Sequence, residues 1–307
     1  MLTTKRIYLA LIALCALVLL VQTARNARGT LFGAASEFKM SEAVKLRAAF
    51  VDSDSSPAAQ DEMAAAAAQN SRLKSELQWT FGGKTQRGWQ IYTPLISHLI
   101  GTDSDAESRE FAAALARWQR RTGLKPSGIL DKETLSAMIT NWQSRRIKDR
   151  TYPPPERILT APASEFWDAS RPEELRGVER QAYSAYKRMV AAAVSDSSSG
   201  LKMTRNGELD QSEKFLKIVS AFRSKEYQEK LRQASPNAGS AGLAVNSPHF
   251  TGRALDLYVG GDPVSTQDAN RMIQTRTRIY LWLVRNAEKF GFVPYFYEPW
   301  HWEYRGE

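Results

Sequence analysis

Ser247-Pro-His-Phe-Thr-Gly-Arg-Ala-Leu-Asp256 and Glu298-Pro-Trp-His-Trp-Glu-Tyr304 are the two segments on which the fold of the last third of this chain depends. The whole sequence has three histidines, and two of them, His249 and His301, lie in these segments. Together with an aspartate and a glutamate of the same segments, they match the residue types of a metal-dependent hydrolase, in which three side chains hold the ion and a carboxylate moves protons. We therefore expect the two segments to meet at one site.

His249, Asp256 and His301 supply the three protein ligands that leave a fourth position on a catalytic zinc open to water. His249 and Asp256 are seven positions apart, an odd offset that would place them on opposite faces of an unbroken strand. Gly252 lies between them and can provide a turn or a bulge that brings both side chains to one ion. Zinc is the expected metal, and nickel or cobalt would also suit two imidazoles and a carboxylate.

Glu298 is the expected general base. It precedes His301 by three positions, again an odd offset, and Pro299 can break the strand register between them. A carboxylate close to the ion, but not among its ligands, can accept a proton from the attacking water and pass it to the leaving amine. Glu303 would share a face with His301 in a regular strand and is the rival candidate, as base or as a support of the histidine.

Some neighbouring side chains also have an ordinary structural explanation. Trp300, Trp302 and Tyr304 would alternate to the opposite face of a strand and are expected in the core, although Trp300 can also line the pocket. Arg223 directly follows an apolar run that suits a short strand. Its place at the end of a buried strand makes it either a surface cation or a functional one.

Composition limits the surroundings in which the protein works. Its 307 residues suit two modest domains with connecting segments. Lysine and arginine total 42 against 33 acidic residues, a net charge of +9 that favours anionic partners such as a membrane surface or a cell-wall polymer. The sequence has no long basic run and no DNA- or RNA-binding motif, so nucleic acid is not an expected partner.

The N-terminus is expected to direct export to the cell envelope. Lys5 and Arg6 precede an apolar run over 7–21, and no charge follows until Arg25. The run is short for a spanning helix but lacks a clear cleavage site, so residues 1–27 are either a signal peptide or, as we favour, a hydrophobic helix that anchors the protein in the membrane. The only cysteine, Cys15, lies in this run, so no disulfide is expected in the exported part.

Composition also divides the rest of the chain. Residues 28–76 are rich in alanine, serine and acids, and they predict a flexible linker whose alanine run can form a short helix without a face to bury. A first folded domain is expected over 77–148, a proline-rich linker over 149–172, and the metal-binding domain over 173–307.

The first domain is expected to contain two short helices around a turn. Phe111, Leu115 and Trp118 recur at helical spacing before Gly123, and the next helix begins near Asp131. Residues 111–135, with their Trp-Gln, Gly-Leu and following Gly, resemble the helical peptidoglycan-binding domain of wall-lytic enzymes. The resemblance implies a small all-α domain that binds peptidoglycan, whereas the residues alone would also explain a packed helix pair without a ligand.

The second domain mixes helices and strands without a regular alternation. We expect a helix over 173–194, a short strand over 217–222, a helix capped by Ser265 or Thr266 that ends at Gly291, and an aromatic strand over 292–297. This order predicts an α+β domain with a small, mainly antiparallel sheet.

The two opening segments also resemble the VanY-type D-alanyl-D-alanine carboxypeptidases. The shared pattern is Ser-x-His-x-x-Gly-x-Ala-x-Asp followed by Glu-x-Trp-His, with Asn-Ala-x-x-Phe-Gly-Phe between them, and it covers about Phe215 to Tyr304. Upstream, Ala221-Phe-Arg-Ser224 with Gln228 is similar to the family's Gly-Tyr-Arg-Ser and following Gln, with alanine and phenylalanine as departures.

This resemblance implies the α+β fold of the Hedgehog and D-Ala-D-Ala peptidase group. It implies zinc ligands at His249, Asp256 and His301, the base at Glu298, and substrate contacts at Arg223, Gln228, Ser247 and Trp300. A fixed cation such as Arg223 suits the carboxylate of a C-terminal D-alanine and the oxyanion that develops during hydrolysis.

We therefore expect a zinc-dependent D-alanyl-D-alanine carboxypeptidase that removes the terminal D-alanine of peptidoglycan stem peptides. Its expected partners are peptidoglycan peptide and glycan, and the membrane through the N-terminal helix. An L,D-carboxypeptidase, a peptidoglycan endopeptidase and a non-catalytic cell-wall-binding protein are the alternatives.

Overall fold

Four short strands form the sheet that carries both opening segments. The computed structural model describes residues 57–205, 209–234 and 244–306. The sheet has the order β5 (Ile218–Ser220), β6 (Ala254–Leu257), β8 (His301–Tyr304) and β7 (Phe292–Pro294), and each neighbouring pair is antiparallel. Every residue of β6 and β8 is buried, so both faces of the centre of the sheet are covered.

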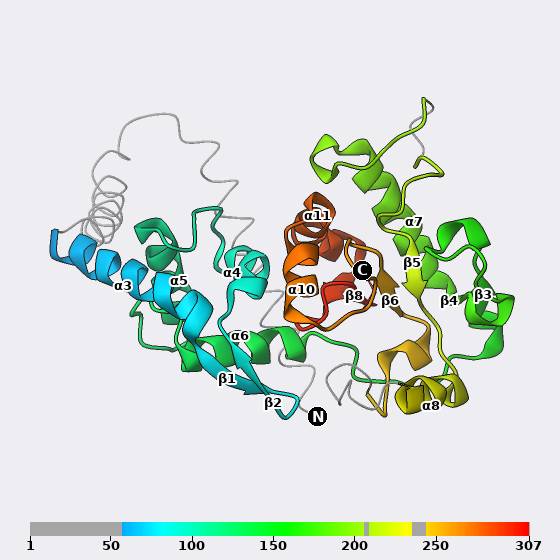
Figure 1. Ribbon diagram of the computed structural model, residues 1–307, viewed down its shortest axis with the longest axis horizontal. Coiled ribbons are helices and arrows are strands. Elements are labelled where there is room, and N and C mark those ends of the chain that lie inside the picture. Colours follow the sequence, from blue (N-terminus) through cyan, green and yellow to red (C-terminus); the bar gives the residue numbers. More distant parts are fainter. Residues whose placement is uncertain (1–56, 206–208, 235–243, 307) are drawn as a thin grey trace, which may run out of the picture. The chain divides into compact units, whose positions relative to one another are not determined.

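The helices of the second domain, coloured from green to red in Figure 1, lie around this sheet. They are α7 (Arg180–Ser195), α8 (Lys225–Ala234), α10 (Asp268–Thr275) and α11 (Arg278–Asn286). A separate antiparallel pair joins β3 (Ile158–Thr160) to β4 (Gly177–Glu179), directly before α7. This arrangement confirms the expectation of a mixed α+β fold with small antiparallel sheets.

Residues 57–148, which comprise the first domain and the segment before it, contain four α-helices, a 3-10 helix over Gln90–Tyr92 and a β-hairpin. The helices are α3 (Pro57–Glu76), α4 (Thr93–Ile100), α5 (Arg109–Arg121) and α6 (Lys132–Ser144), and the hairpin pairs β1 (Gln78–Phe81) with β2 (Lys84–Arg87). Ser108 and Asp131 cap α5 and α6 by accepting hydrogen bonds from the Phe111 and Thr134 amides. The hairpin was not expected in an all-α domain.

Helix α3 differs from the expected flexible linker. Ala66 and Ala67 are buried, in a small cluster that includes Ala112 of α5. Asn70 is fully buried, donates to the Gly128 carbonyl and accepts from the Leu130 amide, both at 2.8 Å. The alanine run therefore does bury a face, because small side chains let two helices approach closely and one asparagine satisfies the backbone of the facing turn.

Three other segments differ from their expected structure. Part of the proline-rich stretch 149–172 forms β3, and the expected helix over 173–194 begins only at Arg180, after β4. The expected helix ending at Gly291 is α10, α11 and a 3-10 helix over Ala287–Phe290. The N-cap positions of α10 and α11 are Gln267 and Thr277 rather than Ser265 or Thr266. Interruptions of this kind depend on where the chain must turn to cover the sheet.

From residue 61 onward the described chain forms one compact unit, so the two domains share contacts. Phe296, just before the Glu298 segment, packs against Phe81, Tyr92 and Trp142 of the first domain with ring centroids 4.7–5.8 Å apart. Arg271 of α10 is 1% exposed and donates 2.9 Å to the Tyr92 hydroxyl. An aromatic core thus joins the domains next to the candidate site.

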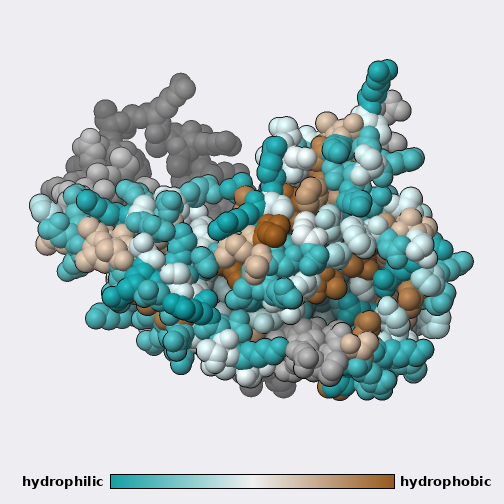
Figure 2. Space-filling view, viewed as in Figure 1, coloured by the Kyte–Doolittle hydropathy of each residue, from teal (hydrophilic) through white to brown (hydrophobic). Residues whose placement is uncertain are grey.

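No helix in the described part of the chain combines the length and apolarity needed to cross a membrane. The apolar run 7–21 and most of the expected linker lie outside the described residues. On the face drawn in Figure 2 the surface is mostly hydrophilic, with hydrophobic side chains in small groups.

Candidate metal centre and active site

The register of two strands brings the two opening segments together. In the antiparallel pair β6–β8, Asp256 lies directly opposite His301. Residues opposite each other in such a pair project to the same face with their side chains in contact. Both are almost fully buried, at 1% and 3% exposure. The sheet thus aligns a carboxylate and an imidazole that are far apart in the sequence.

His249 reaches the same point from a short 3-10 helix, Pro248–Thr251. Ser247 caps this helix by accepting from the His249 amide, and Gly252 ends it with a φ of 67°, a left-handed conformation that glycine adopts without strain. A Cβ at Gly252 would lie 2.8 Å from Ile158 Cδ1 and 3.0 Å from the Glu179 amide nitrogen. The glycine therefore makes the turn that the odd spacing required.

The donor atoms of His249, Asp256 and His301 form a compact group. His249 Nε2 lies 3.2 Å from His301 Nδ1, and these nitrogens lie 3.3 and 2.9 Å from Asp256 Oδ1. For zinc bonds of about 2.0–2.1 Å at tetrahedral angles, donor atoms lie about 3.3 Å apart. The three side chains could therefore hold a metal ion, and their buried nitrogen and oxygen donors fit zinc.

Each histidine is oriented through its second ring nitrogen. His249 Nδ1 lies 2.6 Å from the Ala221 carbonyl oxygen, so Nε2 faces the cluster. His301 has the opposite orientation, because Nε2 lies 3.2 Å from Glu303 Oε1 and Nδ1 faces Asp256. Such partners fix the orientation of metal-binding histidines.

Electrostatics separate the pKa values of the two histidines. Burial and the nearby Arg223 guanidinium lower the pKa of His249 to about 4. Burial acts in the same direction on His301, but hydrogen bonds to Asp256 and Glu303 outweigh it and raise its pKa to about 9. Burial opposes ionisation of Asp256 too, yet His249 and Arg223 hold its pKa well below the usual value. Without a metal, a proton on His301 compensates this carboxylate.

Glu298 lies at the edge of the ligand cluster, with Oε2 3.9 Å from His301 Nδ1. The turn that holds it is closed by hydrogen bonds from its own amide to the Tyr295 carbonyl and from the His301 amide to its carbonyl. Burial, reinforced by the Asp256 charge, raises the pKa of Glu298 to about 8. A positive ion at the cluster would favour the ionised carboxylate.

Glu303, the rival candidate for the base, is fully buried on the far side of His301. It accepts hydrogen bonds from Arg146 Nε at 2.8 Å and from the Ile147 amide at 2.7 Å. Burial would raise the pKa of Glu303, but His301 and Arg146 lower it to about 2. Arg146 was not identified from the sequence, where one arginine in a basic segment carries no distinguishing signal.

Two of the expected substrate contacts, Arg223 and Gln228, lie together, and most of their hydrogen-bonding groups already have partners. Arg223 forms an ion pair with Asp256 and donates to Ser220 Oγ at 2.9 Å and to Gln228 Oε1 at 3.3 Å. Gln228 also donates to the Ala244 carbonyl at 3.0 Å. Trp300 is 2% exposed and belongs to the core. Arg223 contacts one side chain of the candidate metal group directly, through its ion pair with Asp256.

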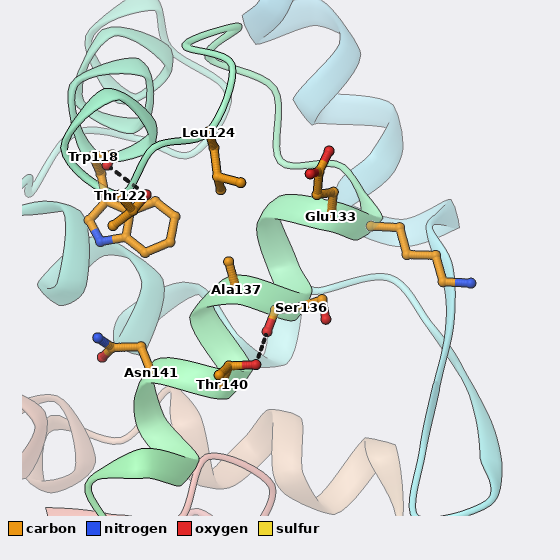
Figure 3. A pocket seen from close by; sticks show the side chains of 9 residues that line it. Trp118, Thr122, Leu124, Glu133, Ser136, Ala137, Thr140 and Asn141 are labelled. Carbon is orange, nitrogen blue, oxygen red and sulfur yellow. Dashed lines mark hydrogen bonds between the residues drawn. The ribbon is translucent and has the colours of Figure 1, made fainter.

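The first domain has a hollow of its own, of about 850 Å³. In Figure 3, Leu124 and Ala137 point toward each other across it, with the Trp118 ring beside them. Polar groups at its rim come mainly from α6. The lining consists of Trp118, Thr122, Leu124, Lys132, Glu133, Ser136, Ala137, Thr140 and Asn141. An apolar floor with a polar rim suits a ligand that carries both apolar and hydrogen-bonding groups.

Two family models match the chain. Residues 176–307 match VanY, described as D-alanyl-D-alanine carboxypeptidase, and residues 99–138 match a putative peptidoglycan binding domain. A search among curated proteins found no match. The first range contains the whole ligand cluster, and the second contains most of the lining of the hollow. Activity on the cell wall implies a location outside the cytoplasm. Residues 176–307 thus form a carboxypeptidase domain of the VanY family, a peptidase, downstream of a peptidoglycan-binding domain.

Proposed function

We propose that this protein is a zinc-dependent carboxypeptidase that hydrolyses the terminal D-alanine from peptidoglycan stem peptides. The observation that carries the proposal is the buried cluster of His249, Asp256 and His301, whose donor atoms lie at tetrahedral spacing inside the VanY-matching domain. A zinc ion held there would supply a Lewis acid that lowers the pKa of water and polarises the scissile carbonyl.

Glu298 acts as the general base in this proposal. Its carboxylate accepts a proton from the attacking water and delivers it to the amide nitrogen, so that D-alanine leaves as a free amine. Its burial beside the cluster supports this role, because a carboxylate in a dry site binds a proton more readily than one in water. Glu303 fits the base poorly, since both of its oxygens are held by Arg146 and Ile147.

Arg223 is proposed to bind the C-terminal carboxylate of the substrate or the developing oxyanion. Its pairing with Asp256 places a fixed cation beside the ligands, and Gln228 and Ser220 hold its orientation. Two charge-assisted hydrogen bonds to a carboxylate would explain a preference for a free C-terminus. Ser247 and Trp300 then act by shaping the site, since both are nearly buried.

The test is mass spectrometry of defined muropeptides with the wild type and Glu298→Gln. We expect the variant to bind zinc normally and to release D-alanine about 10²–10⁴-fold more slowly, because it loses the general base. Glu288→Gln removes an exposed carboxylate outside the site and serves as control. Unchanged release by Glu298→Gln would refute the mechanism.

The same spectra identify the bond that is cleaved. Loss of one D-alanine from a pentapeptide supports the proposal. Loss of the last residue from a tetrapeptide would indicate an L,D-carboxypeptidase, and separation of cross-linked peptides an endopeptidase. A chelator should stop the reaction and added zinc should restore it.

We also propose that the hollow between α5 and α6 holds peptidoglycan, and that residues 1–27 export the protein and anchor it at the membrane. The peptidoglycan-binding match over 99–138 supports the first proposal. The apolar run over 7–21 supports the second. Wall retention and anchoring would both raise the local concentration of substrate without taking part in the chemistry.

A further inference from the structure

We propose that Arg146, which lies just beyond the last helix of the first domain, is a positioning residue for His301 and acts on it through Glu303. This rests on the proposed function, in which His301 is a metal ligand. The inference assigns to the end of the peptidoglycan-binding domain a direct part in building the active site.

Arg146 and its neighbour hold both oxygens of the Glu303 carboxylate. Arg146 Nε and Nη2 donate to Oε1 at 2.8 and 2.5 Å, and the Ile147 amide donates to Oε2 at 2.7 Å. Both guanidinium nitrogens donate to one oxygen and the amide donates to the other, so the three hydrogen bonds together fix the orientation of the carboxylate. Because the backbone amide comes from the next residue, a shift of this segment would move both contacts together.

Glu303 in turn sets the rotation of the His301 ring. Its Oε1, which Arg146 holds, lies 3.2 Å from His301 Nε2. With Nε2 so engaged, Nδ1 faces the donor atoms of Asp256 and His249. Carboxylate partners of this kind orient metal-binding histidines and affect metal affinity.

A second contact keeps the Arg146 guanidinium in place. It lies over the Tyr295 ring, 3.8 Å from the centroid, and the same ring meets the His301 ring edge-on at a centroid distance of 5.8 Å. Arg146 is 13% exposed at its side chain and Glu303 is not exposed at all. The guanidinium therefore lies between an aromatic face and a buried carboxylate, where its direction is restricted.

The chain offers a matched control in the adjacent residue. Arg145 lies on the same segment, but it pairs with Glu288, whose side chain is 59% exposed. Arg145→Met and Arg146→Met therefore remove the same group from the same stretch of backbone, and only the second removes a partner of Glu303.

The experiment measures zinc affinity of the full chain by competition with a chelator, together with kcat and KM on a soluble muropeptide. We expect Arg146→Met to weaken zinc binding by about 10–100-fold and to lower kcat with little change in KM, as loss of an indirect ligand partner does. Arg145→Met should stay within about twofold of the wild type, as exposed ion pairs contribute little.

Arg146→Lys is a second variant, used in case Arg146→Met fails to fold. It keeps the positive charge but cannot make both of the hydrogen bonds that Nε and Nη2 of Arg146 donate to Glu303. We expect its zinc affinity to lie between those of Arg146→Met and the wild type. Equal zinc affinity and kcat for Arg146→Met and Arg145→Met, or wild-type zinc affinity in Arg146→Lys, would overturn the proposal. Failure of the proposed function can be told apart from failure of this inference, because the wild type itself would then bind no zinc or release no D-alanine.

Discussion

At the scale of single residues, two histidines of this site have pKa values shifted in opposite directions. His249 and His301 are both buried, yet one is held neutral with a pKa of about 4 and the other is protonated with a pKa of about 9. The difference comes from their neighbours, because burial and Arg223 lower the pKa of His249, whereas hydrogen bonds to Asp256 and Glu303 outweigh burial at His301. Only His301 has carboxylates on both sides, so without a metal it alone retains a proton.

This difference predicts how stability of the metal-free protein depends on pH. His301 has a folded-state pKa of about 9 against about 6.5 when unfolded, so its contribution is complete below pH 6.5 and is lost as pH rises through 9. Glu298, raised to about 8, changes in the same direction. We expect the free energy of unfolding to fall by on the order of 1–3 kcal/mol between pH 6.5 and 9.

Urea denaturation in the presence of a chelator measures this change. His301→Gln should make the dependence shallower, because one of the two groups with a raised pKa is gone and only the part that comes from Glu298 remains. Equal stability of the metal-free wild type at both pH values would contradict the pKa of His301 inferred from its neighbours.

At the scale of elements, the site depends on one strand pairing and one turn. The β6–β8 register sets Asp256 against His301, and the left-handed Gly252 brings His249 back to the same face. Gly252 also touches the β4 strand, since its carbonyl accepts from the Glu179 amide at 3.0 Å. The turn is therefore enclosed by its neighbours and has little room to adjust.

Gly252→Ala is predicted to destabilise the protein by about 2–4 kcal/mol, because it combines a positive φ with a Cβ that would lie 2.8 Å from Ile158. Gly83→Ala is the control, since Gly83 has a φ of 77° in the β1–β2 turn but nothing within 4 Å of its Cβ position. It should lose only about 1 kcal/mol. Urea unfolding compares the two, and equal losses would show that crowding at Gly252 is unimportant.

At the scale of the whole molecule, the first domain, which contains the peptidoglycan-binding match, makes two separate contributions. Its aromatic residues form a joint core with Phe296, and its last segment supplies Arg146 to Glu303. The hollow of this domain is lined by residues of α5, α6 and the turn between them. Neither Arg146 nor the aromatic residues that contact Phe296 line it. Wall retention should therefore be separable from support of the active site.

Ala137→Trp tests this separation by filling the hollow. We expect the variant to bind sedimented peptidoglycan at least about tenfold more weakly, while kcat and KM on a soluble muropeptide stay within about twofold, because a blocked contact surface removes only local concentration. Ala68→Trp places the same side chain at an exposed position of α3 and should bind as the wild type does. Undiminished pelleting of Ala137→Trp would exclude the hollow as the binding site.

Residue types and spacing predicted that His249, Asp256 and His301 would meet, with a glycine turn between the first two, and the structure brings them together with Glu298 beside them. These features are local, because a metal demands particular donor atoms and an odd spacing demands a break in the strand. The mixed α+β class followed in the same way from the order of periodic segments. The hairpin β1–β2 and the burial of α3 did not, because both depend on what the first domain must cover.

Only the tertiary structure connected Arg146 to Glu303, 157 positions away, and Ala221 to His249. Contacts of this kind leave no periodic trace, since an arginine or a carbonyl near a metal ligand looks like any other in the sequence. They arise when packing brings distant segments within hydrogen-bonding distance and burial makes each polar partner necessary. The chemistry of the site was thus legible in its residues, whereas the means that hold those residues in place come from packing.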